Sequence, residues 1–277
     1  MIGPTLPPGW QLTSRADTSN ELEVDMSTSL LKQVEIQGEG LQASGLPEVH
    51  LDWRPPAPSV GCGLRNLGNS CYLNSVLQCL AYLPPLGQRC TSHLHASACP
   101  RRREGHIDCV ACIVENRLSR CLHGRPGSPE APVRLWKHLH LVSRELRRGS
   151  QEDAHEALRL LIDAMNRDSI RALKGWGYRL PPKEKEPATP VSQLFGGEVQ
   201  SCVECLSCGH CSRTVDPVMD LSLDVSGSTD LESALKRFAA VDTLDGDNKY
   251  RCDGCQRLVN ARKQMTLLRP PLCLVVH

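Results

Sequence analysis

The chain has 277 residues, of which 40% are hydrophobic, so it can bury the core of one large domain or two ordinary ones. Its 32 Lys and Arg residues nearly balance 31 Asp and Glu residues, which excludes a general electrostatic attraction to nucleic acid or to membranes. No apolar run reaches the ~20 residues that cross a bilayer, and the start, MIGPTLPPGW, lacks the features of a secretory signal. We therefore expect an intracellular protein of the cytoplasm or nucleus, without a membrane partner.

Residues 1–60 are expected to form a mostly disordered extension. They mix Pro, Ser, Thr and acidic residues without a sustained apolar period, and they end in the helix-breaking stretch WRPPAP, residues 53–58. A short helix over 30–37 is the one element that their pattern would allow. We assign no chemistry to this segment.

Two helices are predicted in the following part of the chain. Apolar residues recur at helical spacing from near Cys71 until Pro84 and Pro85 end the pattern, which predicts a buried helix. A second helix is predicted over 150–167, where Ser150 and Asp153 form a capping pattern. One apolar stripe follows them, made of Ala154, Ala157, Leu158, Leu161, Ile162 and Met165.

Strand signals dominate after residues 181–190, PPKEKEPATP, which are expected to form a surface loop. Apolar and polar residues alternate over 219–225, which predicts a strand with one buried face. A short helix is expected over 231–238, and the apolar run over 272–276 is typical of a central strand.

Cys71 is a candidate nucleophile because it lies at the start of the first predicted helix. The helix dipole and free backbone N–H groups lower the pKa of a thiol there, and the thiolate is the attacking species. Gly68 and Asn69 allow a tight turn with positive φ, and Asn66 could add a donor for an oxyanion. A small buried cysteine at the start of a core helix is the simpler interpretation, and spacing alone does not decide between them.

The fifteen cysteines favour metal binding or catalysis over disulfides in a reducing compartment. Two CxxC pairs can hold a zinc ion with four thiolates, and such a site is structural because no position is left for a water nucleophile. The chain offers more than two pairs: Cys202, Cys205, Cys208 and Cys211 lie three apart, and Cys252 and Cys255 follow. Disulfides are the alternative for these residues.

A second cluster of metal-ligand types has the form HxxxC followed by CxxC. Its members are His95, Cys99, Cys109 and Cys112. A second zinc ion and free cysteines at the surface both explain the pattern, and the sequence leaves the two open. The neighbouring arginines, residues 101–103, are interpreted as solvated rather than as a nucleic-acid site.

Two motifs give the chain a resemblance to a known family. GLRNLGNSCYLNSVLQ, residues 63–78, resembles the cysteine box of the ubiquitin-specific proteases, with Ser70 where the family usually has Thr. QEDAHE, residues 151–156, resembles the glutamine-acid box that follows it in that family. The resemblance implies that Cys71 is the nucleophile and that Asn66 helps to stabilise the oxyanion.

The same resemblance assigns the residues of the second motif. It places Gln151 and Asp153 near the tail of ubiquitin, while Asp153 also fits a helix cap. We expect His155 to be a solvated helix residue and not the general base. Alignment on Asp216-Pro217 selects Cys205 and Cys208, with Cys252 and Cys255, as the zinc ligands and leaves Cys202 and Cys211 as extras.

The implied fold is a papain-like α+β ubiquitin-specific protease fold. Residues 61–180 would form a helical thumb, and residues 181–277 would form zinc-ribbon fingers and an incomplete β palm. LCLVVH, residues 272–277, resembles the strand that precedes the family's late histidine box, so His277 is not assigned as the base. A cysteine protease needs a histidine base, and we therefore expect little or no hydrolysis from this chain alone.

The implied activity of the complete enzyme is cleavage after the C-terminal glycine of ubiquitin through a Cys71 thioester, with ubiquitin and ubiquitinated proteins as partners. A non-catalytic ubiquitin-binding module is the alternative. A zinc-ribbon protein that binds nucleic acid is a third interpretation, against which the near-neutral charge and the cysteine box argue.

Overall fold

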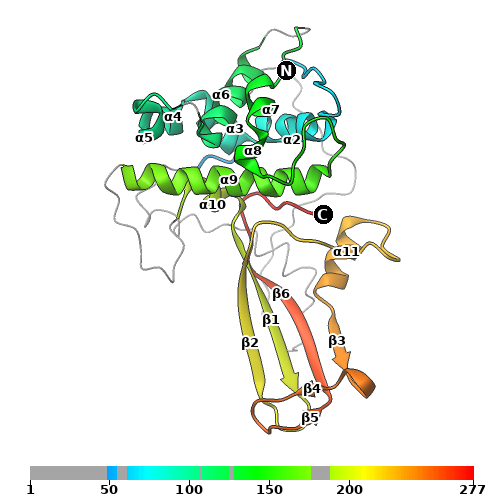
Figure 1. The fold of residues 1–277 in the computed structure, drawn as a ribbon. Coiled ribbons are helices and arrows are strands. Elements are labelled where there is room, and N and C mark those ends of the chain that lie inside the picture. Colours follow the sequence, from blue (N-terminus) through cyan, green and yellow to red (C-terminus); the bar gives the residue numbers. More distant parts are fainter. Residues whose placement is uncertain (1–48, 55–60, 107, 125–127, 176–187) are drawn as a thin grey trace, which may run out of the picture. The chain divides into compact units, whose positions relative to one another are not determined.

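The computed structural model describes residues 49–54, 61–106, 108–124, 128–175 and 188–277. The helix expected over 30–37, the extension before residue 49 and most of the predicted loop over 181–190 lie outside these residues. The described residues combine a group of helices with an antiparallel sheet, which confirms the α+β fold class (Figure 1). None of the helices found among them is both long and apolar enough to cross a membrane.

The first part of the fold, here called the thumb, contains the helices between residues 71 and 175 (Figure 1). They are α2 (Cys71–Ala81), α3 (Pro84–Thr91), α4 (Leu94–Ala98), α5 (Pro100–Arg103), α6 (Val110–His123), α7 (Val133–Lys137), α8 (Leu139–Val142) and α9 (Ala154–Gly175). The apolar faces of α2, α6 and α9 share one core, with Leu73, Leu118 and Leu161 at most 1% exposed. The helix predicted from near Cys71 is confirmed as α2.

Residues 49–54, which we expected to belong to a disordered extension, pack against the thumb. Gln88 on α3 holds them from both sides, because its Oε1 accepts from Arg54 N at 2.7 Å and its Nε2 donates to Asp52 O at 2.9 Å. Val49 also packs against the thumb core. This short stretch therefore forms part of the folded unit.

Helix α9 is displaced from the predicted range of 150–167. It begins at Ala154, because Asp153 rather than Ser150 is the capping residue: Asp153 Oδ1 accepts from Glu156 N at 3.0 Å. It continues to Gly175 because Ala172 and Leu173, each 3% exposed, extend the buried stripe. The apolar pattern located the helix correctly, whereas the helix start predicted at Ser150 was wrong.

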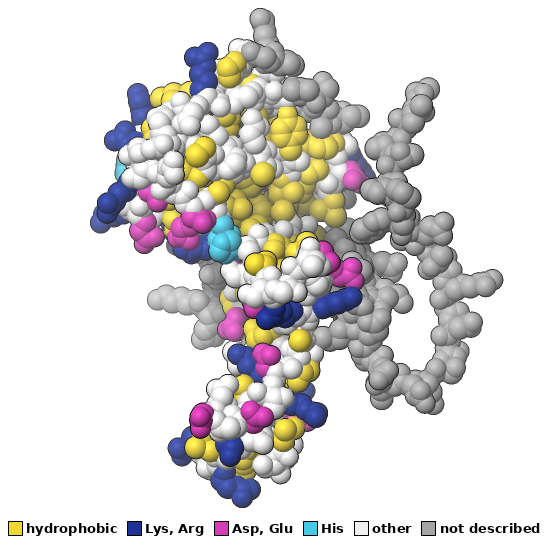
Figure 2. All heavy atoms as spheres, turned by 90° about the vertical axis from the view of Figure 1, so that its right-hand side faces the viewer, with side chains coloured by type: hydrophobic (Ala, Val, Ile, Leu, Met, Phe, Trp, Pro, Cys, Tyr) yellow, Lys and Arg dark blue, Asp and Glu magenta, His cyan; other side chains and the backbone are white. Residues whose placement is uncertain are grey.

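The second part, here called the fingers, is built on a four-stranded antiparallel sheet of order β2-β1-β6-β3 (Figure 1). The strands are β1 (Gly197–Cys205), β2 (Cys211–Val218), β3 (Val241–Leu244) and β6 (Ala261–Arg269), with a small sheet of β4 (Tyr250–Arg251) and β5 (Leu258–Val259) at the tip. Helix α10 (Pro190–Phe195) precedes β1, α11 (Leu231–Phe238) precedes β3, and a 3-10 turn, η2 (Gly246–Asn248), follows β3. In Figure 2 apolar side chains gather on the thumb, while charges of both signs cover the tip of the fingers.

The prediction of regular strands over 219–225 and 272–276 is wrong. The two segments pair with each other through a single parallel bridge between Leu221 and Val276. Leu221 N donates to Val275 O at 2.9 Å, and His277 N donates back to Leu221 O at 2.8 Å. Val225 is 70% exposed, so the apolar alternation does not correspond to one continuous buried face. The helix expected over 231–238 is confirmed as α11.

We predict that Leu161→Ala destabilises the thumb by about 2–5 kcal/mol, because Leu161 is fully buried and the vacated volume cannot refill completely. Arg159→Ala on the exposed face of the same helix should cost less than about 1 kcal/mol, since exposed ion pairs contribute little. Denaturant unfolding of both variants measures the difference. An equal loss of unfolding free energy in the two variants would show that α9 does not bury the face that carries Leu161.

Candidate functional site

The loop before α2 has a defined shape that presents Cys71 at the surface. Gly68 and Asn69 have φ of +90° and +53°, as the predicted tight turn requires. Asn66 Oδ1 fixes this turn by accepting from Gly68 N at 2.9 Å and from Ser70 N at 3.0 Å. Cys71 is the first residue of α2 and is exposed, so its interpretation as a buried core cysteine is wrong.

The other end of the Asn66 amide is available. Its oxygen also accepts from Ser70 Oγ at 3.1 Å, whereas Nδ2 makes no hydrogen bond to any described residue. An amide whose oxygen is held by the loop keeps its two N–H donors for another acceptor. Cys71 lies at the N-terminus of α2, where backbone N–H groups and the helix dipole favour negative charge. This combination can stabilise a thiolate and a developing oxyanion, and the roles of Cys71 and Asn66 stay predictions.

The structure brings the two sequence motifs together. Asn69 Nδ2 in the cysteine loop donates to Gly149 O at 2.7 Å, just before the QEDAHE motif. Gln151 is exposed, and Asp153 caps α9. The N–H of Glu156 is the main cause that lowers the pKa of Asp153, so this carboxylate stays ionised as a cap. The cap predicted for Asp153 is therefore confirmed, and its substrate role stays a prediction.

Glu152 is an acidic residue near Tyr72 that sequence reasoning missed. It accepts from Arg147 N at 3.2 Å, which closes the loop before α9. The hydroxyl of the buried Tyr72 has no hydrogen-bond partner among the described residues. Burial, followed by the charges of Glu152 and Cys71, raises the pKa of Tyr72 to about 12. The motif QEDAHE contains Glu152, but only the fold shows that its carboxylate raises the pKa of Tyr72, the residue after Cys71.

His155 is not the solvated residue that we expected. Its Nε2 lies 2.9 Å from Asp220 Oδ2, and its ring stacks on His277 with centroids 3.9 Å apart. His277 also lies 3.5 Å from Ser222 Oγ through Nδ1. These contacts join α9 to the segments that follow the long strands. Within the described part of the chain, no histidine hydrogen bonds to the Cys71 thiol. We therefore assign neither His155 nor His277 as the general base.

Four predicted ligands come together at the tip of the fingers. Cys205, Cys208, Cys252 and Cys255 have sulfurs within 4.8 Å of one another, and those of Cys208 and Cys252 are 3.7 Å apart. A zinc tetrahedron with Zn–S bonds of about 2.3 Å has edges of about 3.8 Å. The donor set and the spacing therefore fit a structural zinc ion, and this group is called the fingertip cluster below.

The two halves of the fingertip cluster repeat one backbone design. Cys205 O accepts from Gly209 N at 2.9 Å, and Cys252 O accepts from Gln256 N at 2.8 Å. Gly209 and Gln256 both have positive φ, +72° and +55°. Each turn also directs a backbone N–H at its first sulfur, at 3.4 Å for Cys205 and 3.3 Å for Cys252. Such turns present two sulfurs on one side, as a shared metal requires.

The two cysteines of the first turn differ in how readily they form thiolates. Burial raises the pKa of Cys205, but hydrogen bonds from the N–H groups of Cys208 and Ser207 outweigh it and lower the pKa to about 7. The N–H of His210 lowers the pKa of Cys208, but the thiols around it raise the pKa to about 11. The thiolate of Cys205 is thus favoured and that of Cys208 is opposed. A bound divalent ion would favour the thiolate form of both.

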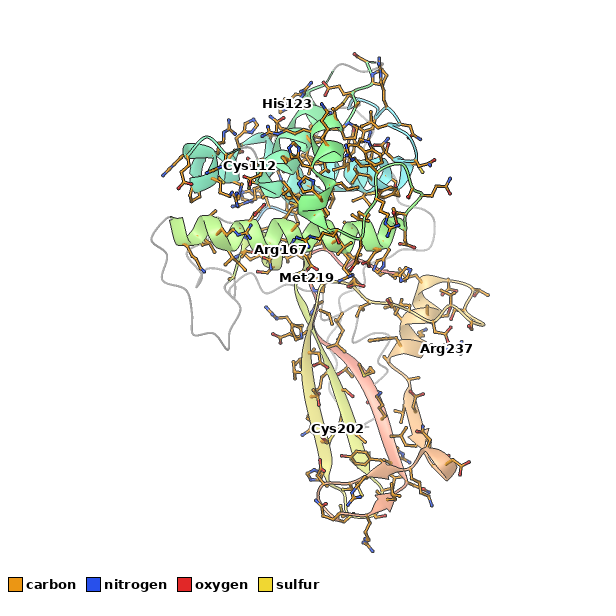
Figure 3. The ribbon with its side chains drawn as sticks, viewed as in Figure 1. Cys112, His123, Arg167, Cys202, Met219 and Arg237 are labelled. Atoms are coloured by element: carbon orange, nitrogen blue, oxygen red, sulfur yellow. A yellow bond between two sulfur atoms is a disulfide. The ribbon has the colours of Figure 1, made fainter. Side chains whose placement is uncertain are left out.

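The two extra cysteines of the fingers form a disulfide. Cys202 on β1 is bonded to Cys211 at the start of β2, across the antiparallel pair (Figure 3). The alternative of a disulfide is therefore correct for these two residues, while the other thirteen cysteines are free. The bond leaves Cys205 and Cys208 for the fingertip cluster, as the family alignment predicts.

A second cluster lies in the thumb, in a different part of the fold (Figure 3 marks Cys112). Its four members are His95, Cys99, Cys109 and Cys112, with ligand atoms within 4.8 Å of one another. His95 Nε2 lies 3.2 Å from Cys109 Sγ. Cys99 and Cys109 are each 2% exposed, so the interpretation as surface cysteines is wrong for both. This group, called the thumb cluster below, fits a zinc ion with three sulfurs and one nitrogen.

Comparison with known proteins identifies the family. The family model described as Ubiquitin carboxyl-terminal hydrolase matches residues 62–277. The chain belongs to this family. Ubiquitin carboxyl-terminal hydrolase 25 of Arabidopsis thaliana is 43% identical over 245 residues, which cover 87% of this chain and 36% of that protein. Ubiquitin carboxyl-terminal hydrolase 42 of Homo sapiens is 36% identical over 210 residues, covering 76% of this chain and 15% of that protein.

A solved structure shows the same fold in a related hydrolase. The SAGA Ubp8/Sgf11/Sus1/Sgf73 DUB module bound to ubiquitin aldehyde matches with a TM-score of 0.64 and 25% identity, covering 83% of this chain and 49% of that chain. The resemblance to the ubiquitin-specific proteases is thereby confirmed. The chain spans about a third or less of the length of these two hydrolases from Arabidopsis thaliana and Homo sapiens.

We predict that position 69 separates two contributions to the cysteine loop. Asn69→Gly keeps the positive φ but loses the hydrogen bond to Gly149, which should cost about 0.5–1.5 kcal/mol. Asn69→Val should cost about 1–2 kcal/mol more, because a β-branched residue is strained at this φ. Denaturant unfolding of the two variants tests the order, and a valine variant as stable as the glycine variant would refute the described turn.

Proposed function

We propose that this chain carries the nucleophile, the oxyanion donors and the zinc-bearing fingers of a deubiquitinating thiol protease. The observation that carries the proposal is the exposed Cys71 at the start of α2, in a loop tied to the glutamine-acid motif. Family membership supports it, as does the related structure, whose title describes a module bound to ubiquitin aldehyde.

The proposed chemistry begins with the Cys71 thiolate. The sulfur attacks the carbonyl carbon of the last glycine of ubiquitin, and the carbonyl oxygen takes the negative charge. Asn66 Nδ2 and the N–H groups at the start of α2 stabilise that oxygen. Loss of the amine leaves a thioester on Cys71, which water then hydrolyses. Protonation of the leaving amine needs a general acid that no described residue provides at Cys71.

The tail of the substrate is proposed to lie along the residues just before α9, at the start of the second motif. Gln151 is exposed there, and Glu152 and Asp153 follow it in the chain. Oxygen atoms of this loop can accept hydrogen bonds from an extended peptide backbone or from basic side chains. Ubiquitin and ubiquitinated proteins are the proposed partners, and the balanced charge of the chain does not favour nucleic acid.

Both metal clusters are proposed to hold structural zinc. Zinc would cross-link the two turns at the fingertip and, in the thumb, join α4 and its following residue to the start of α6. Neither site leaves an open position for catalysis, so zinc would stabilise the fold and take no part in the reaction. Thirteen of the fifteen cysteines are free, and seven of these are proposed metal ligands. This usage suits a reducing compartment, and we propose an intracellular location in the cytoplasm or nucleus.

We predict that a ubiquitin probe with a C-terminal electrophile forms a covalent adduct with this chain and that Cys71→Ser abolishes it. The probe tests the position and nucleophilicity of the sulfur without requiring the later steps of hydrolysis. Cys79→Ser is the matched control, since Cys79 is also exposed and lies on the same helix. Intact-mass spectrometry measures the adduct.

Two results would contradict this proposal. Reversible binding of ubiquitin without an adduct would favour a non-catalytic binding module. Labelling that persists in Cys71→Ser and disappears in Cys79→Ser would place the reactive sulfur elsewhere on α2.

We predict two zinc ions per purified chain, one for each cluster, and one ion after either Cys252→Ser or Cys99→Ser. Removing a thiolate from a four-ligand site leaves an incomplete tetrahedron, and chelators should then remove the ion readily. Elemental analysis gives the stoichiometry, and Cys79→Ser should retain both ions. A wild-type chain with a single zinc ion that Cys99→Ser does not remove would refute the thumb site.

A further inference from the structure

We propose that two buried carboxylates, Glu115 on α6 and Asp168 on α9, are positioning residues for the metal ligands of the thumb cluster. They hold the two backbone segments that carry these ligands, and neither carboxylate belongs to the cluster itself. The inference rests on the proposed zinc ion in the thumb and adds to it the groups that keep its ligands in place.

Glu115 holds the segment of His95 and Cys99. Its Oε1 accepts from His95 N at 2.8 Å and its Oε2 accepts from Ala96 N at 2.7 Å. These N–H groups lie in the first turn of α4, which has no side-chain cap because His93, the residue before it, supplies none. Through these two hydrogen bonds Glu115 caps α4 from another helix, and its side chain is 3% exposed.

Asp168 holds the segment of Cys109 and Cys112 in the same way. Its Oδ2 accepts from Val110 N at 2.6 Å and from Ala111 N at 3.3 Å, the first two N–H groups of α6. Cys109, the residue before this helix, directs its sulfur toward Cys112 N at 3.4 Å, so it caps a different N–H group. Asp168 is 5% exposed, and its other oxygen pairs with Arg171 at 2.7 Å.

The energetics favour a dedicated role. Burying a carboxylate is costly unless hydrogen bonds satisfy it, and each of these two is satisfied by a pair of backbone N–H groups beside a metal ligand. The charge of a carboxylate near a site with three thiolates is unfavourable in itself. The gain must therefore come from geometry, by which the ligands are held in position before the ion binds.

The fingertip cluster offers a contrast within the same chain. Its two turns close on strand backbone, with Cys205 N donating to His210 O at 2.9 Å and Cys252 N donating to Arg257 O at 3.0 Å. Hairpin hydrogen bonds thus position these ligands without a carboxylate. The thumb ligands lie on a short helix and a helix start, where N–H groups have no such partners, and Glu115 and Asp168 supply them.

Two further contacts tie this arrangement to its surroundings. His95 and Glu115 both line a surface pocket together with Met165 and Ser169 of α9. Asp168 lies on the same helix, so α9 contributes directly to the support of the metal ligands. The support of the thumb cluster thereby links α4 and α6 to the helix whose first turn contains the end of the glutamine-acid motif.

The experiment uses the full chain with zinc and compares Glu115→Gln, Asp168→Ala and Asp168→Asn. Each oxygen of Glu115 serves a different N–H, so Glu115→Gln turns one acceptor into a donor and should weaken zinc at the thumb about 10–100-fold. One oxygen of Asp168 serves both N–H groups. Asp168→Ala should therefore weaken zinc about 10–100-fold, whereas Asp168→Asn, which keeps an acceptor oxygen, should largely restore it.

Chelator competition gives the affinity of each zinc ion. Cobalt substitution distinguishes the two sites by their spectra, because the thumb offers three sulfurs and a nitrogen and the fingertip offers four sulfurs. The fingertip ion is the internal control. Glu130→Gln is the matched control, since Glu130 is a thumb carboxylate that pairs with Arg117 and Arg120 and touches no ligand segment.

The outcomes separate this inference from the zinc proposal beneath it. A wild-type chain without zinc in the thumb would refute the thumb site itself. Zinc in the wild-type thumb with unchanged affinity in Glu115→Gln and Asp168→Ala would overturn the positioning role, and so would an equal loss at both sites, since that reports a general defect of folding. If Asp168→Ala does not fold, Glu115→Gln decides the question by the same site-specific comparison.

Discussion

The hydrogen bond from Asn69 to Gly149 connects the two parts of the site that the rest of the arrangement depends on. Its donor lies in the loop that presents Cys71, and its acceptor lies just before the motif that caps α9. The residues are 80 positions apart, so only a folded thumb brings them together. The left-handed φ of Asn69 aims its side chain and also turns the chain into α2, so one residue serves both tasks.

The thumb and the fingers solve the same problem of presenting metal ligands by different means. In the fingers, two similar turns with positive φ at Gly209 and Gln256 place sulfurs on one side, and strand pairing holds them. In the thumb, helix starts present the ligands, and buried carboxylates hold the helix starts. The difference follows from backbone chemistry, since a hairpin satisfies its own N–H groups and a helix start does not.

Local pattern accounts for what the sequence predicted well. The apolar face of α2, helix α11 and the cysteine pairs follow from spacing over a few residues, and a long motif identified the family. Contacts between distant segments were not predictable in this way. Nothing in the sequence pairs His155 with Asp220, and the single bridge between Leu221 and Val276 looks locally like two full strands. Side-chain alternation reports burial on one face, whereas a strand also needs a neighbour along its whole length.

Helix α9 shows why the two parts of the proposed function depend on one another. Its first turn is capped by Asp153 and carries His155 against Asp220, its middle buries Leu161, and its later turns carry Asp168. A helix is stiff over such a length, because each turn is bonded to the next. A change that shifts one end therefore alters the position of the other. Metal support in the thumb and the placement of the glutamine-acid motif are consequently properties of one rigid element, and the cysteine loop is tied to the start of that element through Gly149.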